Sequence, residues 1–353
     1  MRLVPYDNSA KWRLLAAPAA AFGATLGLSA LLILAAHAPV LTAYALLIKN
    51  GFGSAFAWSE TLTRATPLIL TALSVSVAFR AKLYNIGAEG QLYAGALAAV
   101  AVGGMHGGTG WPISAHWLFP AMFVAAALGG ALLLIVPTWL KTKFGVDEAV
   151  TTLLLNFITL LMVSLLLDGP LKDPLSLGWP QSVALNPDLE LSRLAAKMRV
   201  TSGLAIAVVL AIGLYFVGRH TVLGFEIRAV GANPRAAEFA GMPVGRIILK
   251  TAVLSGALSG LAGAVEVAGR TSYVTLDMSP GYGYTGIAVA MLAGLHPLGI
   301  VAMAIFVAGI LIGADGMSRT IGVPTYLADV MVALAVLSML TASMLAKYRI
   351  RLK

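Results

Sequence analysis

The chain lacks cysteine altogether and contains few charged residues. Without a thiol, disulfides, thiolate nucleophiles and cysteine-based metal sites are excluded. Only 11% of the 353 residues are charged and 59% are hydrophobic, with a mean hydropathy of +0.88, whereas soluble domains carry roughly 25% charged residues. These values exclude a soluble globular protein. They predict an integral membrane protein in which residues 1–353 form a single domain built from closely spaced spans.

The chain also lacks the residue patterns of several kinds of active site. It contains no G-x-x-x-x-G-K-[ST] phosphate loop and no acidic and basic constellation for hydrolysis, so we do not expect it to hydrolyse ATP or to be an enzyme. No two of the five histidines have helical ligand spacing, so no metal or other cofactor is expected. The net charge of +9 is compatible with nucleic acid, but the distribution of the basic residues indicates membrane orientation instead.

Long apolar runs fill most of the chain, and a spanning helix needs about 20 mainly apolar residues. The ten candidate spans are Leu14–Ala36, Leu62–Phe79, Gly90–Val102, His116–Leu140, Val150–Leu167, Val200–Val217, Ile247–Ala268, Tyr284–Leu295, Leu298–Ile312 and Tyr326–Leu345. The first is too long for a signal-peptide core of ~7–15 residues. The third and eighth are short, and each follows a glycine-rich polar segment, which is typical of a broken or re-entrant helix.

The sequence thus predicts an all-α integral membrane protein with about ten transmembrane helices. Ten spans divide into two sets of five, and an odd number in each half makes the halves inverted repeats. The similarity of Asn85–Gly90 to Ser279–Tyr284, just before the two short spans, favours this arrangement. With a cytoplasmic N-terminus, the inside segments hold about twice as many lysines and arginines as the outside ones, as the positive-inside rule requires.

This orientation places both termini in the cytoplasm and two long loops on opposite sides. The loop Arg219–Lys250 lies inside, whereas the loop Asp168–Arg199 lies outside and is extracytoplasmic. The outer loop carries charges of both signs and is expected to be solvated, with a short amphipathic helix and a role in docking a binding protein.

The first glycine-rich break reads AFRAKLYNIGAEGQLYAG and lies between two apolar stretches. Polar groups there need partners inside the protein or a water-lined cavity, so the segment is expected to line a solute path. Its candidate residues are Asn85, Gly87, Glu89, Gly90 and Gln91. The two amides can donate and accept hydrogen bonds to a nucleobase or sugar, or they can cap the broken helix. Glu89 either binds solute or holds unwound backbone N–H groups.

Other candidate residues lie in the seventh span and at the second break. Glu266 falls well inside an apolar run, where a carboxylate costs at least ~2.5 kcal/mol, so it either faces the path or pairs with Arg270 one turn later. Tyr282 belongs to the tyrosines at the breaks, which either stack on a base or anchor at the membrane interface. The glycine spacing from Gly256 to Gly263 predicts close helix packing.

The inside loop carries a helix-start signal. Pro234 suits the first helical position and Asn233 the N-cap, so a short helix should follow and end before Gly241. Small residues around Ala237 would give this helix a face that carries one aromatic side chain, Phe239. From the residues alone, a helix that docks into a partner's groove and an ordinary solvated loop are equally compatible with this pattern.

Four motifs occur in an order and spacing that resemble the permeases of bacterial ABC importers. The motifs are NIGAEGQ at Asn85–Gln91, RAVGANPRAAEFAGM at Arg228–Met242, SGALSGLAGAVE at Ser255–Glu266 and YTGIAVAMLAG at Tyr284–Gly294. The resemblance is to the nucleoside and simple-sugar branch of binding-protein-dependent permeases, related to the branched-chain amino acid and ribose types. It runs from about Leu62 to the last span.

The resemblance implies a translocation subunit in the bacterial cytoplasmic (inner) membrane, with its energy source on another chain. It implies that Arg219–Lys250 is the coupling loop that contacts a cytoplasmic ATPase, which has tandem nucleotide-binding domains. The coupling positions that it implies are Arg228, Gly231, Asn233, Pro234, Ala237 and Gly241. A second homologous permease, giving a heterodimer, and an extracytoplasmic substrate-binding lipoprotein are the other implied partners.

The family branch suggests purine nucleosides as the first choice of solute, with pentoses or related sugars second. The alternative is a secondary transporter that couples the uptake of small polar solutes to protons through Glu89 or Glu266. The two hypotheses differ in where energy enters, because a coupling helix has no purpose in an ion-coupled carrier.

Overall fold

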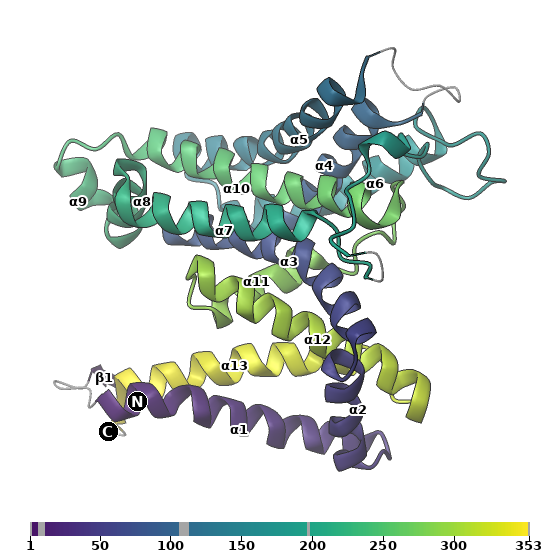
Figure 1. The fold of residues 1–353 in the computed structure, drawn as a ribbon. Helices are drawn as coiled ribbons and strands as arrows, with labels where there is room; N and C mark the ends of the chain where they lie inside the picture. Colours follow the sequence, from purple (N-terminus) through teal and green to yellow (C-terminus); the bar gives the residue numbers. More distant parts are fainter. Residues whose placement is uncertain (1, 6–10, 106–112, 196–197, 352–353) are drawn as a thin grey trace. The chain divides into compact units, whose positions relative to one another are not determined.

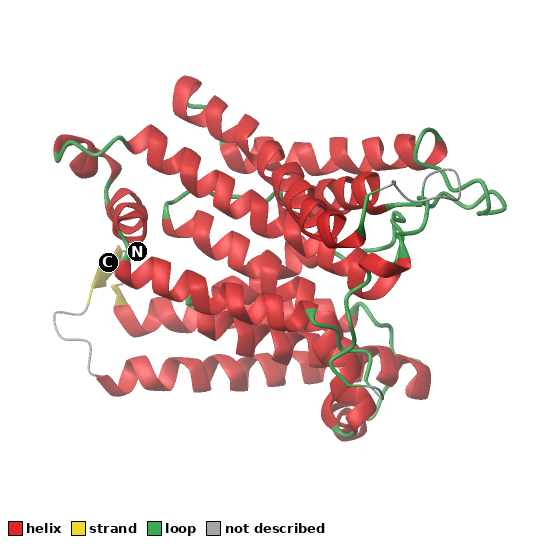
Figure 2. Cartoon of the chain, turned by 45° about the horizontal axis from the view of Figure 1, so that its top comes forward, coloured by secondary structure: helices red, strands yellow, loops and turns green. Residues whose placement is uncertain are grey.

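The computed structural model describes residues 2–5, 11–105, 113–195 and 198–351. Most of these residues are helical, as Figure 2 shows. The chain divides into two compact units. The first unit comprises Met1–Thr61 and Phe306–Lys353, and the second unit is Leu62–Ile305. Two helices belong partly to each unit: α3 (Ala55–Arg80) and α12 (Pro297–Ile321).

The first unit is built from helices near the two ends of the chain. Helix α1 (Lys11–Ala35) packs along α13 (Leu327–Lys347). Strand β1 (Arg2–Pro5) pairs antiparallel with β2 (Tyr348–Arg351). Helix α2 (Val40–Phe52) follows α1 after a bend of 112°. It lies so close to α12 that Gly309 and Gly313 have no space for a Cβ.

The core of the second unit is a group of three helices that touch through glycine. These are α4 (Ala88–Gly103), α5 (Ala115–Phe144) and α10 (Val244–Glu266), which lie side by side in Figure 1. A Cβ at Gly260 of α10 would collide with the backbone of α5 at Ala126, and a Cβ at Gly263 would collide with the backbone of α4 at Leu92. The close packing predicted from the glycine spacing in α10 is therefore confirmed.

The remaining helices surround this core. Helix α6 packs on α4 and α5, α7 packs on α8, and α11 packs on α4. Their bounds are α6 (Glu148–Asp168), α7 (Gly203–His220), α8 (Val222–Ala232), α9 (Pro234–Phe239) and α11 (Tyr282–Leu292). A π-helical turn, η3 (Val267–Thr271), extends α10, and a 3-10 turn, η2 (Pro187–Leu189), lies before α7.

Each of the ten apolar runs falls on a helix of the structure. The third and eighth runs correspond to α4 and α11, which have 16 and 11 residues and follow non-helical breaks. By length and composition, six of the described helices qualify as membrane spans, or seven if the bent pair of α1 and α2 counts as one. The structure is thus that of a helical multi-pass membrane protein.

The outer loop differs from its expected form. In the described part of Asp168–Arg199, the three-residue turn η2 replaces the expected amphipathic helix. Backbone hydrogen bonds tie the loop to the chain after α10 instead, because the N–H groups of Leu185 and Leu191 donate to the carbonyls of Ser272 and Ala268, at 2.7 and 2.8 Å. Non-local pairing of this kind leaves no helical periodicity in the sequence.

Two further helices, α2 and α8, lie where no helix was expected. Helix α8 contains two glycines, which lower helix propensity. Each glycine allows a close approach: Gly224 lies on the backbone of α7 at Val217, and Gly231 lies on the carbonyl of Arg80. Tertiary packing therefore compensates for the weak local preference.

Candidate functional site

Two side-chain amides at the first break form hydrogen bonds with each other. Asn85 Nδ2 donates to Gln91 Oε1 at 3.0 Å, and Gln91 Nε2 donates back to Asn85 Oδ1 at 2.9 Å. The same Asn85 oxygen accepts the N–H of Gly87 at 2.9 Å. Both amides are buried. They join the non-helical segment to the first turn of α4 and satisfy each other's hydrogen-bonding groups.

Buried serines extend this network to α3 and α10. Asn85 Nδ2 also donates to Ser255 Oγ at 3.1 Å. Ser255 Oγ donates to the carbonyl of Ser74 at 2.9 Å, and Ser259 Oγ donates to Ser74 Oγ at 2.8 Å. Sequence reasoning missed these serines, although Ser255 and Ser259 lie four residues apart and so share a face of α10.

Asn156 of α6 holds the break from the other side. Its Oδ1 accepts the N–H of Gly90 at 2.8 Å, while its Nδ2 donates to the carbonyl of Ile86 at 2.8 Å and to Tyr284 Oη at 3.2 Å. A Cβ at Gly90 would lie 2.9 Å from Asn156 Oδ1, so glycine makes room for this contact. Asn156 was not among the predicted residues. A buried amide within a 21-residue apolar helix is the signal that would have found it.

The second break meets the first at the start of α11. Glu89 Oε2 accepts the N–H of Gly283 at 2.6 Å. A Cβ at Gly283 would collide with the backbone of Glu89. Thr71 Oγ1 donates to the carbonyl of Tyr282 at 3.0 Å. The carboxylate lies at the N-terminus of α11, where the helix dipole favours negative charge, so Glu89 of one break holds backbone of the other.

Glu266 pairs with Arg270. The guanidinium donates to Glu266 Oε1, and Arg270 Nη2 also donates to the carbonyl of Met278 at 2.9 Å. The Glu266 side chain is 2% exposed, so its charge is neutralised by a partner one turn later. Of the two roles expected for Glu266, the structure shows the pairing.

The side chains around the first break leave little space. The hollow lined by Gly87, Gly90, Gln91, Thr152 and Asn156 is too small for a water molecule. The structure therefore brings Asn85, Glu89, Gln91 and Tyr282 into one packed region of hydrogen-bonded groups.

Residues 233–241 around α9, for which the resemblance implies a coupling role, are called the coupling segment here, and they start as the cap predicts. Asn233 Oδ1 accepts the N–H of Ala236 at 3.2 Å, Pro234 is the first residue of α9, and Gly241 after the helix has φ +81°. Only glycine adopts such a left-handed conformation readily. The predicted short helix is confirmed.

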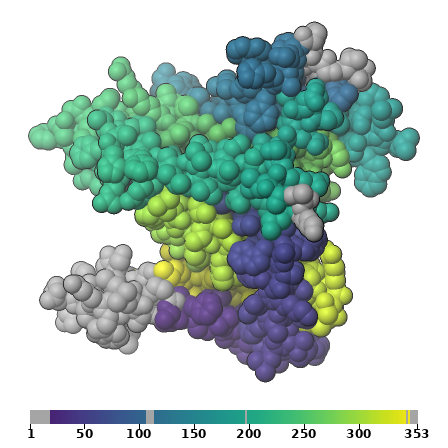
Figure 3. All heavy atoms as spheres, in the orientation of Figure 1, coloured from purple at the N-terminus to yellow at the C-terminus, as the bar shows by residue number. Residues whose placement is uncertain are grey.

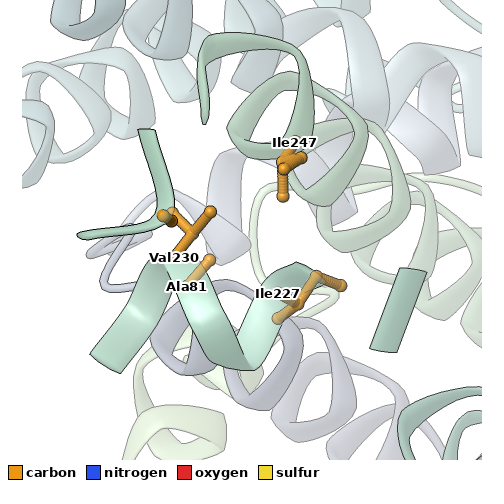
Figure 4. Packing of buried hydrophobic residues seen from close by; sticks show 5 residues of the cluster. Ala81, Ile227, Val230 and Ile247 are labelled. Carbon is orange, nitrogen blue, oxygen red and sulfur yellow. The ribbon is translucent and has the colours of Figure 1, made fainter. Parts of the chain in front are cut away.

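Helix α9 is fixed to the second unit through one side chain. Ala237 is buried in a hydrophobic cluster formed with Ala81, Ile227, Val230 and Ile247. Figure 4 shows four labelled members of this cluster on α8, on α10 and on the turn after α3. The inward face of α9 is therefore already occupied by residues of its own chain.

The outward face of α9 carries the exposed aromatic residue Phe239. Its side chain is 97% exposed, and Ala236 and Ala240 beside it are exposed as well. Residues of α8 and α9 form one end of the surface of the second unit, green in Figure 3. The segment thus has a buried side that anchors it and a free side that presents a large apolar group.

The sequence matches a known permease family. Residues 57–341 match the family model of the branched-chain amino acid transport system permease component. The chain belongs to this family of membrane permease subunits of ABC transporters.

Several relatives are similar over most of the chain. It is 35% identical to the guanosine ABC transporter permease protein NupP of Bacillus subtilis, over 88% of this chain and 89% of that protein. It is 32% identical to the glucose ABC transporter permease protein TsgB13 of Haloferax volcanii, over 99% and 93% of the two chains. A second Bacillus subtilis guanosine permease, NupQ, is 30% identical over 70% of this chain and 77% of its own length.

Proposed function

We propose that the chain is the translocation subunit of an ATP-driven importer of nucleosides, energised by a separate ATPase subunit. The observation that carries this proposal is the two-sided helix α9. Ala237 anchors the helix to the second unit, whereas Phe239 projects 97% exposed from its other side. This helix is anchored to the spans and exposes an aromatic side chain. Such a helix is suited to a contact that transmits motion from a partner. It has no use in a proton-coupled carrier.

The coupling positions in and beside α9 form two groups: residues that begin or end the helix, and residues that pack inward. Asn233 and Pro234 start α9, and Gly241 ends its turn. Ala237 and Gly231 pack inward, against the cluster and the Arg80 backbone. Together they hold Phe239 against the ATPase.

The proposed complex contains further subunits. Matches to both NupP and NupQ, two guanosine permeases of one organism, support a heterodimer of this chain with a homologous permease. An ATPase with tandem nucleotide-binding domains and an extracytoplasmic substrate-binding lipoprotein complete it. The chain lies in the bacterial cytoplasmic (inner) membrane with both termini cytoplasmic, as the distribution of lysine and arginine indicates.

We assign purine nucleosides as the first choice of solute and pentoses or related sugars as the second. The guanosine permeases among the relatives support the first choice, and the glucose permease supports the second. The path runs beside the two breaks, and the residues proposed to line it are Asn85, Gly87, Glu89, Gly90, Gln91, Glu266 and Tyr282. A water-filled cavity opens there in the working complex as the network rearranges.

The joined breaks also support the proposed symmetry of the fold. Ten spans form two inverted halves, with α4 and α11 as the broken third and eighth spans. In this arrangement the breaks occupy equivalent positions, and Glu89 of the first half holds Gly283 of the second.

The test is to replace Phe239 with Ala in the complex reconstituted with its ATPase. Because the side chain is exposed, membrane insertion and thermal stability should stay unchanged, while uptake and substrate-stimulated ATP hydrolysis should be lost. The matched control is Phe216→Ala, because Phe216 is a phenylalanine on α7 with a side chain that is also exposed, at 55%. Full uptake by Phe239→Ala, or uptake that an uncoupler abolishes and that ATP does not affect, would contradict the proposal.

A further inference from the structure

Two arginines line one small pocket of the second unit. Arg80 is the last residue of α3 and Arg228 lies on α8. Apolar side chains of α3, α7 and α8 form most of the remaining wall, among them Val77, Leu214 and Ile227. Within the described structure, no carboxylate lines this pocket.

Neither helix can supply a carboxylate to these arginines. A side chain three or four residues away would be in reach along a helix. Around Arg228 those positions are Gly224, Phe225, Gly231 and Ala232, and before Arg80 they are Ser76 and Val77. Among the described residues, Arg228 makes no hydrogen bond or ion pair.

The backbone is shaped to hold the Arg80 guanidinium in place. Arg80 Nη2 donates to the carbonyl of Leu295 at 2.7 Å. A Cβ at Gly218 of α7 would lie 3.2 Å from Arg80 Nη1, and a Cβ at Gly231 of α8 would collide with the Arg80 carbonyl. Glycines on both neighbouring helices therefore let α7 and α8 close around this residue.

Two like charges at one pocket repel each other, and a bound anion would relieve this repulsion. Guanidinium groups form strong, bidentate hydrogen bonds with phosphate. The pocket lies where two candidate spans end, at Arg80 of α3 and His220 of α7. Basic pockets between spans at a membrane surface are binding sites for anionic lipid headgroups.

We propose that Arg80 and Arg228 bind the phosphate of an anionic phospholipid. The apolar residues that line the pocket would contact the part of the lipid next to the phosphate. A bound lipid would join α8, which leads into the coupling segment, to α3. The proposal does not depend on which solute is transported, and it gives Arg228, a coupling position implied by the resemblance, a second ligand.

The test is native mass spectrometry of the full chain, purified and supplied with phosphatidylglycerol or with zwitterionic phosphatidylcholine. The wild-type chain should retain phosphatidylglycerol in preference to phosphatidylcholine. Arg228→Gln should reduce the retained phosphatidylglycerol roughly fivefold, since one arginine near a lipid surface contributes about 1 kcal/mol. Arg228 is exposed, so this variant should fold, and Arg80→Gln serves as the second variant.

Arg246→Gln is the matched control, because Arg246 is an exposed cation near the start of α10 that does not line the pocket. It should retain as much phosphatidylglycerol as the wild-type chain. Equal retention by Arg228→Gln and by the wild-type chain would overturn the proposal. Displacement of the lipid by millimolar inorganic phosphate would identify a small-anion site instead. Loss of ATPase association by Arg228→Gln with unchanged lipid retention would assign the pocket to a partner carboxylate.

Discussion

The two breaks and the coupling segment differ in the kind of side chain that each one buries and exposes. At the breaks, the polar side chains of Asn85, Gln91 and Asn156 are buried and find their partners within the chain. In the coupling segment, the large apolar side chain of Phe239 is exposed, and the described part of the chain does not cover it. The first region is complete within one subunit, whereas the second leaves a large apolar side chain exposed, which we propose contacts the ATPase.

The comparison predicts different consequences of mutation. A change at the breaks removes a partner from a buried polar group and should lower stability first. A change at the tip of the coupling segment should leave stability intact and act on function alone. Substitutions of buried groups at and near the breaks test the expected loss of stability, and their expected effects decrease from Gly283 to Asn156.

The largest effect is expected from Gly283→Ala. The new Cβ would collide with the backbone of Glu89, which cannot move without separating the two breaks. We expect no monodisperse protein after solubilisation, as judged by size-exclusion chromatography. The control is Gly245→Ala, because Gly245 is a helical glycine with open space around it. Normal yield from Gly283→Ala would show that the breaks do not need their close contact.

Breaking the Glu266–Arg270 pair should have the next largest effect. Arg270→Gln leaves a carboxylate that is 2% exposed without its charged partner, which should cost about 3 kcal/mol of unfolding free energy. The double variant Glu266→Gln/Arg270→Gln removes the stranded charge and should recover much of that loss. Thermal unfolding of both variants in detergent measures the difference. A double variant less stable than Arg270→Gln would rule out this electrostatic explanation.

Asn156→Leu should have a smaller effect. It leaves the N–H of Gly90 and the carbonyl of Ile86 without their side-chain partner, at a cost of about 2 kcal/mol. The thermal midpoint should fall, whereas the control Phe157→Leu on the exposed face of α6 should change little. An unchanged midpoint for Asn156→Leu would show that the break is held by the amide pair of Asn85 and Gln91 alone.

The parts of this structure that could be predicted are those with local signals. The Asn233–Pro234 cap defined the start of α9, and the glycine spacing in α10 predicted the contact with α5 and α4. Apolar runs located helices because a spanning helix needs an uninterrupted apolar stretch. In each case the deciding residues lie within one or two turns of one another.

The parts that could not be predicted depend on contacts between distant residues. Helix α8 is stabilised by α7 and by the Arg80 backbone, which its own two glycines do not reveal. Asn156 lies 66 residues from Gly90, and a lone amide in an apolar helix does not indicate its partner. The six residues of α9 are too few to show by periodicity that Ala237 faces inward.

The central claim is that Phe239 contacts a separate ATPase, and the absence of natural cysteine allows a direct measurement. Phe239→Cys in membranes that contain the assembled complex should form a cross-link to the ATPase subunit with a short bifunctional reagent. Phe216→Cys on α7 should form none. ATP binding should change the yield at residue 239, because the coupling contact moves with the ATPase. Equal cross-linking at both positions, or no cross-link at residue 239 in any nucleotide state, would contradict the account.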